Sequence, residues 1–404
     1  MNPVAEARDE DLELYSLHGI LGIGVRGRQN PIALVINKEF QNFRSLSGQS
    51  DLTIVLGGVP SADWKPHGVL VGDNLLCDTT ANEVVVLRKS KPVYSKENVR
   101  FLIRGDTRSS TGPVSIYIPS LAIGAPHWER VARMLLRYDF LTSAEFIADE
   151  ILTGLVEPFL YYSLPDHGCS LVHASAVSLS NGSGIMFYGS SNVGKTTMAL
   201  HMVKEGCDFF GDDLVMVAKN DGRILSYPKR IKLGAQHFAP FPEFTKRIGS
   251  TMGPAKRMLF TRFAMSPSDR PFQMTFHHPA ISDIFDNARI GDQCDLHAVV
   301  RLGRGTTEDF SLQEIGMESC VATLKTDLFW EFDTPPYRVN QYRYCLAYTS
   351  HNDFLERELE QHNKVGQVIA KAISKARTFE LLLPLKPEAR QVQRAIGKLL
   401  SVLG

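Results

Sequence analysis

The chain has 404 residues, of which 44% are hydrophobic, and its 44 Lys and Arg residues balance its 44 Asp and Glu residues. This length predicts two or three domains of about 150 residues each, with enough apolar residues for a sizeable core. The neutral balance excludes a chain that is basic as a whole, the type that binds nucleic acid or an anionic membrane. Ordinary charged and aromatic fractions, 22% and 9%, exclude a fibrous or disordered chain.

The six cysteines form no C-x-x-C pair and match no zinc-ribbon spacing, so we expect buried thiols in a reducing compartment. The acidic start, MNPVAEARDEDLEL, differs from the basic and apolar start of a signal peptide. The longest stretch without Asp, Glu, Lys or Arg, 167–194, is rich in Ser, Gly and Asn and is therefore not a membrane span. We expect a cytoplasmic protein with neither a membrane nor a nucleic acid as its partner.

Residues 1–125 are predicted to form a β-rich N-terminal domain. Short runs of β-branched and apolar residues alternate there with Gly, Pro, Asn and Asp. The predicted strands are 32–36, 52–56, 68–72, 83–87, 99–103 and 114–118.

Residues 126–165 are predicted to form a helical connector, because apolar residues recur at helical spacing from His127 to Leu164. Ser143, with Glu145 two positions later, indicates a helix start. Pro158 indicates a kink or a stop.

In residues 166–404 strands and helices alternate, so the fold class of the whole chain is predicted to be mixed α/β. The stretch 234–295, rich in Pro, Phe and Met, is expected to be irregular. We expect strands at 169–179, 185–189, 208–218, 227–233, 297–303 and 378–385, and helices at 198–206, 353–376 and 387–403.

One motif carries chemistry by itself. The segment GSSNVGKT (189–196) fits G-x-x-x-x-G-K-[ST], and it follows an apolar strand and opens a helix. Such a loop turns its backbone N–H groups around phosphate oxygens, and the helix N-terminus adds partial positive charge. Lys195 would reach the β- and γ-phosphates, and the Thr196 hydroxyl would bind Mg²⁺. The predicted nucleotide-binding residues are Gly189, Ser190, Ser191, Asn192, Val193, Gly194, Lys195, Thr196 and Thr197.

Two adjacent carboxylates, Asp212 and Asp213, follow on the next predicted strand. A strand–loop–helix–strand unit brings part of that strand near the phosphates. One carboxylate then suits Mg²⁺, and the other suits a base that takes a proton from an attacking hydroxyl. His173, on the strand before the loop, is a candidate to orient the base and tune its pKa.

The GTPase class is disfavoured. A GTPase needs D-x-x-G roughly 40 residues after the loop and N-K-x-D for guanine, and neither pattern stands at the right place. There is also no signature of a transport ATPase. A nucleotide-binding regulatory or scaffold protein without catalysis stays open as the alternative to a kinase.

Taken together, His173, GSSNVGKT and KEGCDFFGDD (204–213) resemble the catalytic domain of HPr kinase/phosphorylase and related P-loop kinases, which share a fold with phosphoenolpyruvate carboxykinase. The closing TFELLLPL strand (378–385) and the terminal helix look like the end of such proteins. The resemblance implies a kinase domain over 166–404, with ATP and Mg²⁺ as cofactors. Because members of this family form closed oligomers, it also leaves a homo-oligomer open.

By resemblance, Lys195 contacts phosphates and Thr196 binds Mg²⁺. Asp212 would be the base, His173 its partner, and Asp213 a second carboxylate on the metal side. The chain departs from the family in lacking a downstream Glu signature: no Glu follows Asp213 until Glu243. The sequence therefore resembles more closely the divergent HPr-kinase-related proteins, whose acceptors vary or are unknown.

Basic residues after this segment are further candidates to stabilise a transferring phosphoryl group, although each by itself fits a solvated surface charge better. The adjacent His277 and His278 would point to opposite faces of a strand and are a poor metal pair. The basic candidates are Lys229, Arg230, Lys232, Lys256, Arg257 and Arg262.

The sequence therefore predicts an ATP- and Mg²⁺-dependent phosphotransferase with Asp212 as base. Its acceptor would be a hydroxyl of a protein, a peptide or a small-molecule alcohol. Nothing in the N-terminal part looks catalytic, so we expect acceptor recognition there.

Overall fold

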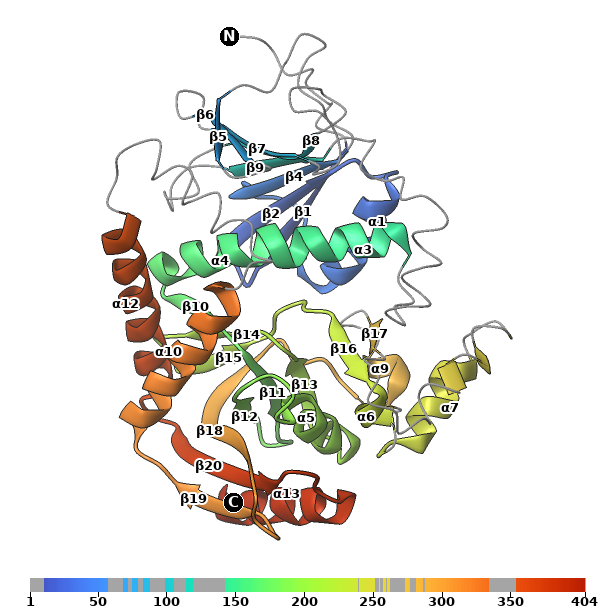
Figure 1. Cartoon of the computed structure of the whole chain (residues 1–404), viewed down its shortest axis with the longest axis vertical. Coiled ribbons are helices and arrows are strands. Elements are labelled where there is room, and N and C mark those ends of the chain that lie inside the picture. The colour runs from blue at the N-terminus through green and yellow to red at the C-terminus, as the bar shows by residue number, and fades with distance from the viewer. Residues whose placement is uncertain are drawn as a thin grey trace. The chain divides into compact units, whose positions relative to one another are not determined.

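The computed structural model shows a mixed α/β protein with several sheets (Figure 1). The described residues divide into two compact units. The first holds those up to 118, with 142–167, 332–333 and 354–363; the second holds those of 168–331 and 364–403. The structure describes residues 11–56, 68–71, 75–78, 83–87, 99–104, 114–118, 142–238, 240–250, 254, 257–258, 260–261, 273–276, 281–285, 288–333 and 354–403.

The first unit is built on a nine-stranded sheet with the order β3-β1-β2-β4-β9-β8-β7-β6-β5. The strands predicted at 52–56, 68–72, 83–87, 99–103 and 114–118 are confirmed to within a residue or two. Strands β1, β2, β3 and β6 were not predicted. The bounds are β1 Leu12–Leu17, β2 Leu21–Arg26, β3 Arg44–Ser45, β4 Leu52–Leu56, β5 Val69–Val71, β6 Leu75–Asp78, β7 Glu83–Leu87, β8 Val99–Arg104 and β9 Val114–Ile118.

The prediction of a strand at 32–36 is wrong, because these residues lie in helix α1 (Pro31–Glu39). The Asn30 side chain accepts a hydrogen bond from the backbone N–H of Ile32 at 2.9 Å, and Pro31 occupies the first turn, where its missing N–H costs nothing. Ile32, Ala33 and Ile36 then share one buried face. A cap and a 3.6-residue apolar stripe outweigh the β propensity of the run IALVI.

The helical segment of the first unit consists of α3 (Ser143–Ile151), a π-helical turn over Leu152–Val156, and α4 (Glu157–Ser163). The predicted start is confirmed: Thr142 and Glu145 form a capping box of two reciprocal hydrogen bonds, at 3.2 and 2.6 Å. Pro158 does not stop the helix, but the turn directly before it widens from α to π geometry. Residues 127–141, also predicted as helical, lie outside the described residues.

The second unit holds a sheet with the order β10-β14-β15-β18-β12-β11-β13, and β20 and β19 extend it beside β18. Helices α5 and α13 pack on it through a core of aliphatic and aromatic side chains. The strand bounds are β10 Cys169–Val172, β11 Ala174–Ser178, β12 Ser183–Tyr188, β13 Asp208–Gly211, β14 Val215–Ala218, β15 Arg223–Leu225, β18 Gln293–Gly305, β19 Ser311–Glu314 and β20 Arg377–Pro384. The helix bounds are α5 Lys195–Lys204, α10 Met317–Asp333, α12 Phe354–Ile373 and α13 Ala389–Leu403.

The predicted helices at 353–376 and 387–403 and the strand at 378–385 are confirmed as α12, α13 and β20. The stretch 234–295, expected to be irregular, contains short elements where it is described. Helix α10 was missed. The short elements are β16 Ile231–Gly234, α6 Ala235–Phe238, α7 Pro242–Ser250, β17 Gln273–Phe276 and α9 Ile281–Ile284.

Strand direction decides which segments meet. Strand β12 runs parallel to β18, and β18 runs parallel to β20, so these three carboxyl ends lie at one edge of the sheet. Strand β11 is antiparallel to both β12 and β13. The end of β13 and the beginning of β11 therefore lie at the edge where β12 ends. In open α/β sheets this edge is where ligands bind.

Two long strands predicted from the sequence are each broken in the structure. The run 169–179 divides at His173 into β10 and β11, and the run 208–218 divides after Gly211 into β13 and β14. Strands β10 and β14 pair at one end of the sheet order, whereas β11 and β13 pair at the other end. Each run therefore contributes one strand to each end of the sheet order, and the two ends are connected at His173 and directly after Gly211.

Five described cysteines, Cys77, Cys169, Cys207, Cys294 and Cys320, are free and buried, as expected, and Cys345 lies outside the described residues. Burial raises the pKa of the Cys169, Cys207 and Cys320 thiols to about 11, which keeps them protonated and unreactive at neutral pH. Across the described ranges, no helix is both long and apolar enough to cross a bilayer.

His201, on α5, leads to a prediction about stability. Its ring is 5% exposed and lies 4.7 Å from the Phe241 ring, and its Nε2 has no hydrogen-bond partner among the described residues. Burial, with Lys204 nearby, lowers its pKa, against an opposing effect of Glu205. His201 therefore binds a proton more readily in the unfolded chain than in the folded one. As the pH falls below the ordinary histidine pKa of about 6.5, protonation of His201 favours the unfolded chain and the free energy of unfolding decreases.

We expect His201→Leu to raise the free energy of unfolding by about 1 kcal/mol at neutral pH, since no buried imidazole nitrogen is left unpaired. It should also flatten the decline of the melting temperature between roughly pH 7 and pH 5. Thermal melts across this range measure both effects, with substitution of the exposed His167 by Gln as the control. If the melting temperature of His201→Leu declined with pH as steeply as that of the wild type, His201 would not be the source of this pH dependence.

Candidate active site

The loop 189–194 connects the end of β12 to the first turn of α5. Gly189 and Gly194 have φ angles of 140° and 116°, and Asn192 also has a positive φ, 65°. A Cβ atom at Gly189 would lie 2.6 Å from the Leu302 carbonyl oxygen, so no other residue fits there without a shift of the backbone. The loop is thus shaped by glycine, and it leads its backbone N–H groups into a helix N-terminus, a geometry that binds anions.

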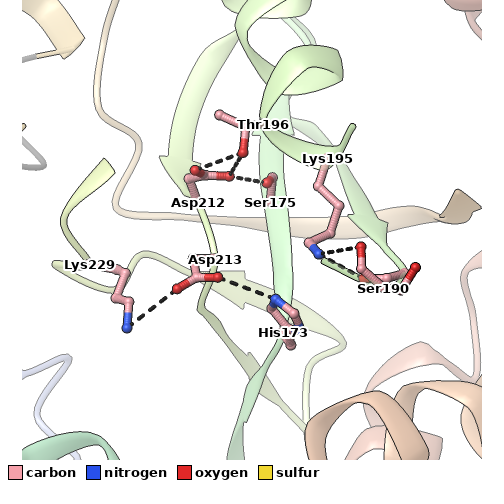
Figure 2. Close-up of polar contacts among 9 residues, drawn as sticks. His173, Ser175, Ser190, Lys195, Thr196, Asp212, Asp213 and Lys229 are labelled. Carbon is pink, nitrogen blue, oxygen red and sulfur yellow. Dashed lines mark hydrogen bonds and ion pairs between the residues drawn. The ribbon is translucent and has the colours of Figure 1, made fainter. Parts of the chain in front are cut away.

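Lys195 is the first residue of α5 and its side chain folds back over the loop. Its Nζ donates to the carbonyl oxygens of Gly189 at 2.7 Å and Ser190 at 3.3 Å (Figure 2). The residue is 7% exposed. Ser190, Ser191 and Asn192 are exposed, so the outer side of the loop is open to solvent.

Asp212 lies just past the end of β13 and is held by two hydroxyl groups. The Thr196 hydroxyl, on α5, lies 2.9 and 3.0 Å from its two carboxylate oxygens, and the Ser175 hydroxyl, on β11, donates to Oδ1 (Figure 2). Asp212 is 4% exposed. Burial raises its pKa and Asp213 adds to this, while the two hydroxyl groups and Lys195 oppose it.

Asp213 has a left-handed backbone, with a φ of 71°, and its side chain makes different contacts. His173 Nε2 lies 3.3 Å from Oδ1, and Lys229 Nζ lies 3.5 Å from Oδ2. The Asp213 side chain is 37% exposed, whereas those of His173 and Lys229 are each 5% exposed. Burial alone would raise its pKa, but Lys229 and His173 outweigh burial and hold the pKa well below the usual range.

The expected pairing of His173 with Asp212 is wrong, because His173 contacts Asp213. Consecutive residues in an extended strand point to opposite faces, and the left-handed turn at Asp213 separates the two carboxylates further. Asp212 therefore turns toward Thr196 and the loop 189–194, and Asp213 turns toward His173 and Lys229 (Figure 2).

The basic candidates are dispersed. Lys229 contacts Asp213, and the charge of Lys232 also lowers the pKa of Asp213. Arg230 is buried at 3% exposure. Arg257 donates to the carbonyl oxygen of Gly249 at 2.7 Å, far along the chain from the loop. The remaining candidates, Lys256, Arg262, His277 and His278, lie outside the described residues.

Arg304, near the end of β18, was not among the residues predicted from the sequence. Its Nε donates to the carbonyl oxygen of Val193 at 2.8 Å, and its Nη1 donates to that of Pro384 at 3.2 Å. It therefore fastens the loop to the neighbouring strand ends. The signal was present as an Arg closing an apolar run, RLGRG (301–305), but the pairing of β18 with β12 was needed to interpret it.

The site also offers oxygen ligands for Mg²⁺. The Thr196 hydroxyl and the Asp212 carboxylate are hard oxygen donors in direct contact at the base of the loop. In the described part of the chain no group of three or more His, Cys, Asp or Glu side chains could hold a metal ion. Mg²⁺ bound together with a nucleotide uses only one or two protein ligands, so these two residues fit it.

Comparison of the chain with models of known protein families finds no family that matches. Comparison with curated proteins finds no relative with a significant match.

Proposed function

We propose that the protein is an ATP- and Mg²⁺-dependent phosphotransferase that transfers the γ-phosphoryl group to a hydroxyl acceptor. The observation that carries this proposal is the direct contact of Thr196 with Asp212 at the base of a glycine-shaped loop, with a second carboxylate, Asp213, adjacent to it. A loop alone supports only nucleotide binding. Two carboxylates with separate surroundings supply the separate metal and proton functions that phosphoryl transfer uses.

The residues of the loop have the roles expected in such an enzyme. Backbone N–H groups of 189–194 and the N-terminus of α5 would bind the phosphate oxygens. The Lys195 ammonium, now donating to two carbonyl oxygens of its own loop, would exchange these for phosphate oxygens, a stronger charge-assisted contact. Thr196 and Asp212 would hold Mg²⁺, which when bound neutralises charge that develops on the β- and γ-phosphates.

The contacts favour an exchange of the two carboxylate roles that the sequence predicted. Asp212 is buried and occupied by the Thr196 and Ser175 hydroxyl groups, an environment suited to orienting a metal-binding hydroxyl. Asp213 is exposed enough to meet an acceptor, and His173 and Lys229 fix its orientation. We therefore assign the base to Asp213 and the metal side to Asp212.

In the proposed step, an Asp213 carboxylate oxygen takes the proton of the acceptor hydroxyl. The acceptor oxygen forms a bond to the γ-phosphorus, the bond from this phosphorus to the β–γ bridging oxygen breaks, and ADP leaves with that electron pair. Lys229 and His173 keep Asp213 ionised before the step, and the same two contacts lower its pKa and so weaken it as a proton acceptor. His173 is thus a positioning residue for the base.

The resemblance to HPr-kinase-related proteins supports the same proposal for 166–404. The remainder, with the β-rich domain predicted over 1–125 and the helical connector over 126–165, is proposed to recognise the acceptor. The acceptor is a protein, a peptide or a small-molecule alcohol, and a cytoplasmic location stays a prediction.

Incubation of the full-length protein with γ-labelled ATP, Mg²⁺ and a cell extract tests the function. We expect a labelled acceptor that disappears when Mg²⁺ is chelated and when Thr196 is replaced by Val, a substitution of similar size that removes the hydroxyl. ATP binding without any labelled product, in the extract or on the protein itself, would favour the non-catalytic regulatory alternative instead.

Arg304 leads to a prediction about nucleotide affinity. Arg304→Met removes the donors to Val193 and Pro384 but keeps an apolar stem, so the loop loses its link to β18 and β20. We expect ATP to bind about 3- to 10-fold more weakly, because Arg304 acts on ATP only through the loop, so that only part of the roughly 1.5–3 kcal/mol of a hydrogen bond from a charged group is lost from binding. Calorimetric titration measures this, with substitution of the exposed Arg394, which pairs with Asp309, as the control. Equal affinities in the wild type and Arg304→Met would contradict it.

A further inference from the structure

Helix α10 brings a third carboxylate toward the proposed nucleotide site. The Thr323 hydroxyl of α10 lies 2.9 Å from the hydroxyl of Tyr188, the fully buried last residue of β12. Gly189 follows Tyr188 directly, so this contact sets α10 against the point where the phosphate loop begins. Cys320, Leu324 and Leu328 are the buried residues that face inward beside Thr323.

Asp327 lies four residues after Thr323, which places it one turn further along the same face of α10. Its carboxyl interacts electrostatically with Lys195, His173 and Arg301. Arg301 is the register partner of Tyr188 on β18, so the strand pairing places it at the same edge. Burial raises the pKa of Asp327, and these three basic residues oppose that rise. Asp327 therefore lies on the face of α10 that meets the end of β12, and its carboxyl interacts with the lysine of the loop.

Asp327 was not predicted from the sequence. It lies some 130 positions after the loop in a helix that was not predicted, and only the packing of α10 on β12 brings it to the site. Neither the proposed metal side nor the proposed base uses it. A negative charge near the cation that would bind the β- and γ-phosphates is expected to oppose the binding of polyanions.

We propose that Asp327 is a specificity residue that selects metal-complexed ATP over bare ATP by repelling the nucleotide that carries uncompensated charge. This inference rests on the proposed nucleotide site. Bare ATP carries two more negative charges than its Mg²⁺ complex, so a fixed carboxylate disfavours it more strongly. The selection admits the nucleotide together with the ion that the transfer step needs, and it reduces occupation of the loop by nucleotide that is unable to react.

Removal of the charge provides the test. Affinities of Asp327→Asn and the wild type for ATP are measured by calorimetry on the full chain, once with excess Mg²⁺ and once with EDTA. We expect bare ATP to bind about tenfold more tightly to the variant and Mg–ATP at most about threefold more tightly, from through-space interactions at an effective dielectric of about 20. The preference for the complex over bare ATP should fall accordingly.

Two matched variants sharpen the test. Glu318→Gln removes an equal charge from an exposed position in the first turn of the same helix and should leave the preference unchanged. Asp327→Ser is a second neutral variant, so that the result does not depend on the folding of one substitution; melting temperatures verify both.

The inference would be overturned if both neutral variants kept the wild-type ratio of the affinities for Mg–ATP and bare ATP, even if both affinities rose or fell together. Failure of the proposed nucleotide site looks different, since the wild type itself would then bind neither bare nor complexed ATP. Failure of the transfer alone would leave ATP binding intact and would appear as the absence of a labelled acceptor.

Discussion

Asp213→Asn is expected to slow phosphoryl transfer by about 10²- to 10⁴-fold, the usual contribution of a positioned base. Asparagine keeps the shape of the side chain and an oxygen that accepts from His173, but it takes no proton. Binding of Mg–ATP should stay close to that of the wild type, because Asp213 is directed to His173 and Lys229 rather than to Thr196. Initial rates of transfer to the labelled acceptor and calorimetric ATP titrations separate the two effects.

Asp212→Asn should behave differently, which makes the pair of variants informative. It removes the charge beside Thr196, so we expect the Mg²⁺ concentration for half-maximal activity to rise about 10- to 100-fold, as when an orienting partner of a metal ligand is lost. Asp221→Asn, at an exposed aspartate paired with Arg223 elsewhere in the same unit, is the control. The opposite pattern, with proton transfer lost in Asp212→Asn and metal dependence in Asp213→Asn, would restore the roles predicted from the sequence.

Lys195→Met is expected to weaken ATP binding about 10- to 100-fold, since hydrogen bonds to charged groups contribute about 1.5–3 kcal/mol. Methionine matches the length of the lysine stem, so the shape of the loop, which the glycines impose, should persist. Displacement of a fluorescent ATP analogue measures the loss.

The control for Lys195→Met is Lys204→Met, at an exposed residue in the last turn of the same helix, which should bind ATP as the wild type does. A normal ATP affinity in Lys195→Met would show that the loop 189–194 is not the nucleotide site.

The location of the candidate site was predictable because its main elements are local in sequence. A six-residue glycine loop between an apolar strand and a helix needs no distant contact to adopt its shape, and the structure has β12, the loop and α5 in this order. The capping box at Thr142 and Glu145 is equally local. Such features are encoded by residues within one or two turns of each other.

The secondary structure predicted from the sequence was wrong where packing decides between two local preferences. The run IALVI has β propensity, yet it forms α1 because Asn30 and Pro31 start a helix and the buried face has helical period. Likewise, each of the runs 169–179 and 208–218 is apolar enough for one strand, but each divides between the two ends of the sheet order. Propensity alone does not show where a chain leaves a sheet.

The amino-acid order alone was enough to predict the glycine loop, Lys195, Thr196 and the adjacent carboxylates, because spacing along the chain defines them. Only the fold decided that Asp212 joins Thr196 and Ser175, that Asp213 joins His173 and Lys229, and that Arg304 and Asp327 come near the loop. Those partners lie between 16 and 132 positions apart, and the direction of paired strands and the face of a packed helix bring them together. Neither property is contained in any single stretch of the chain, because each depends on which distant segment covers it.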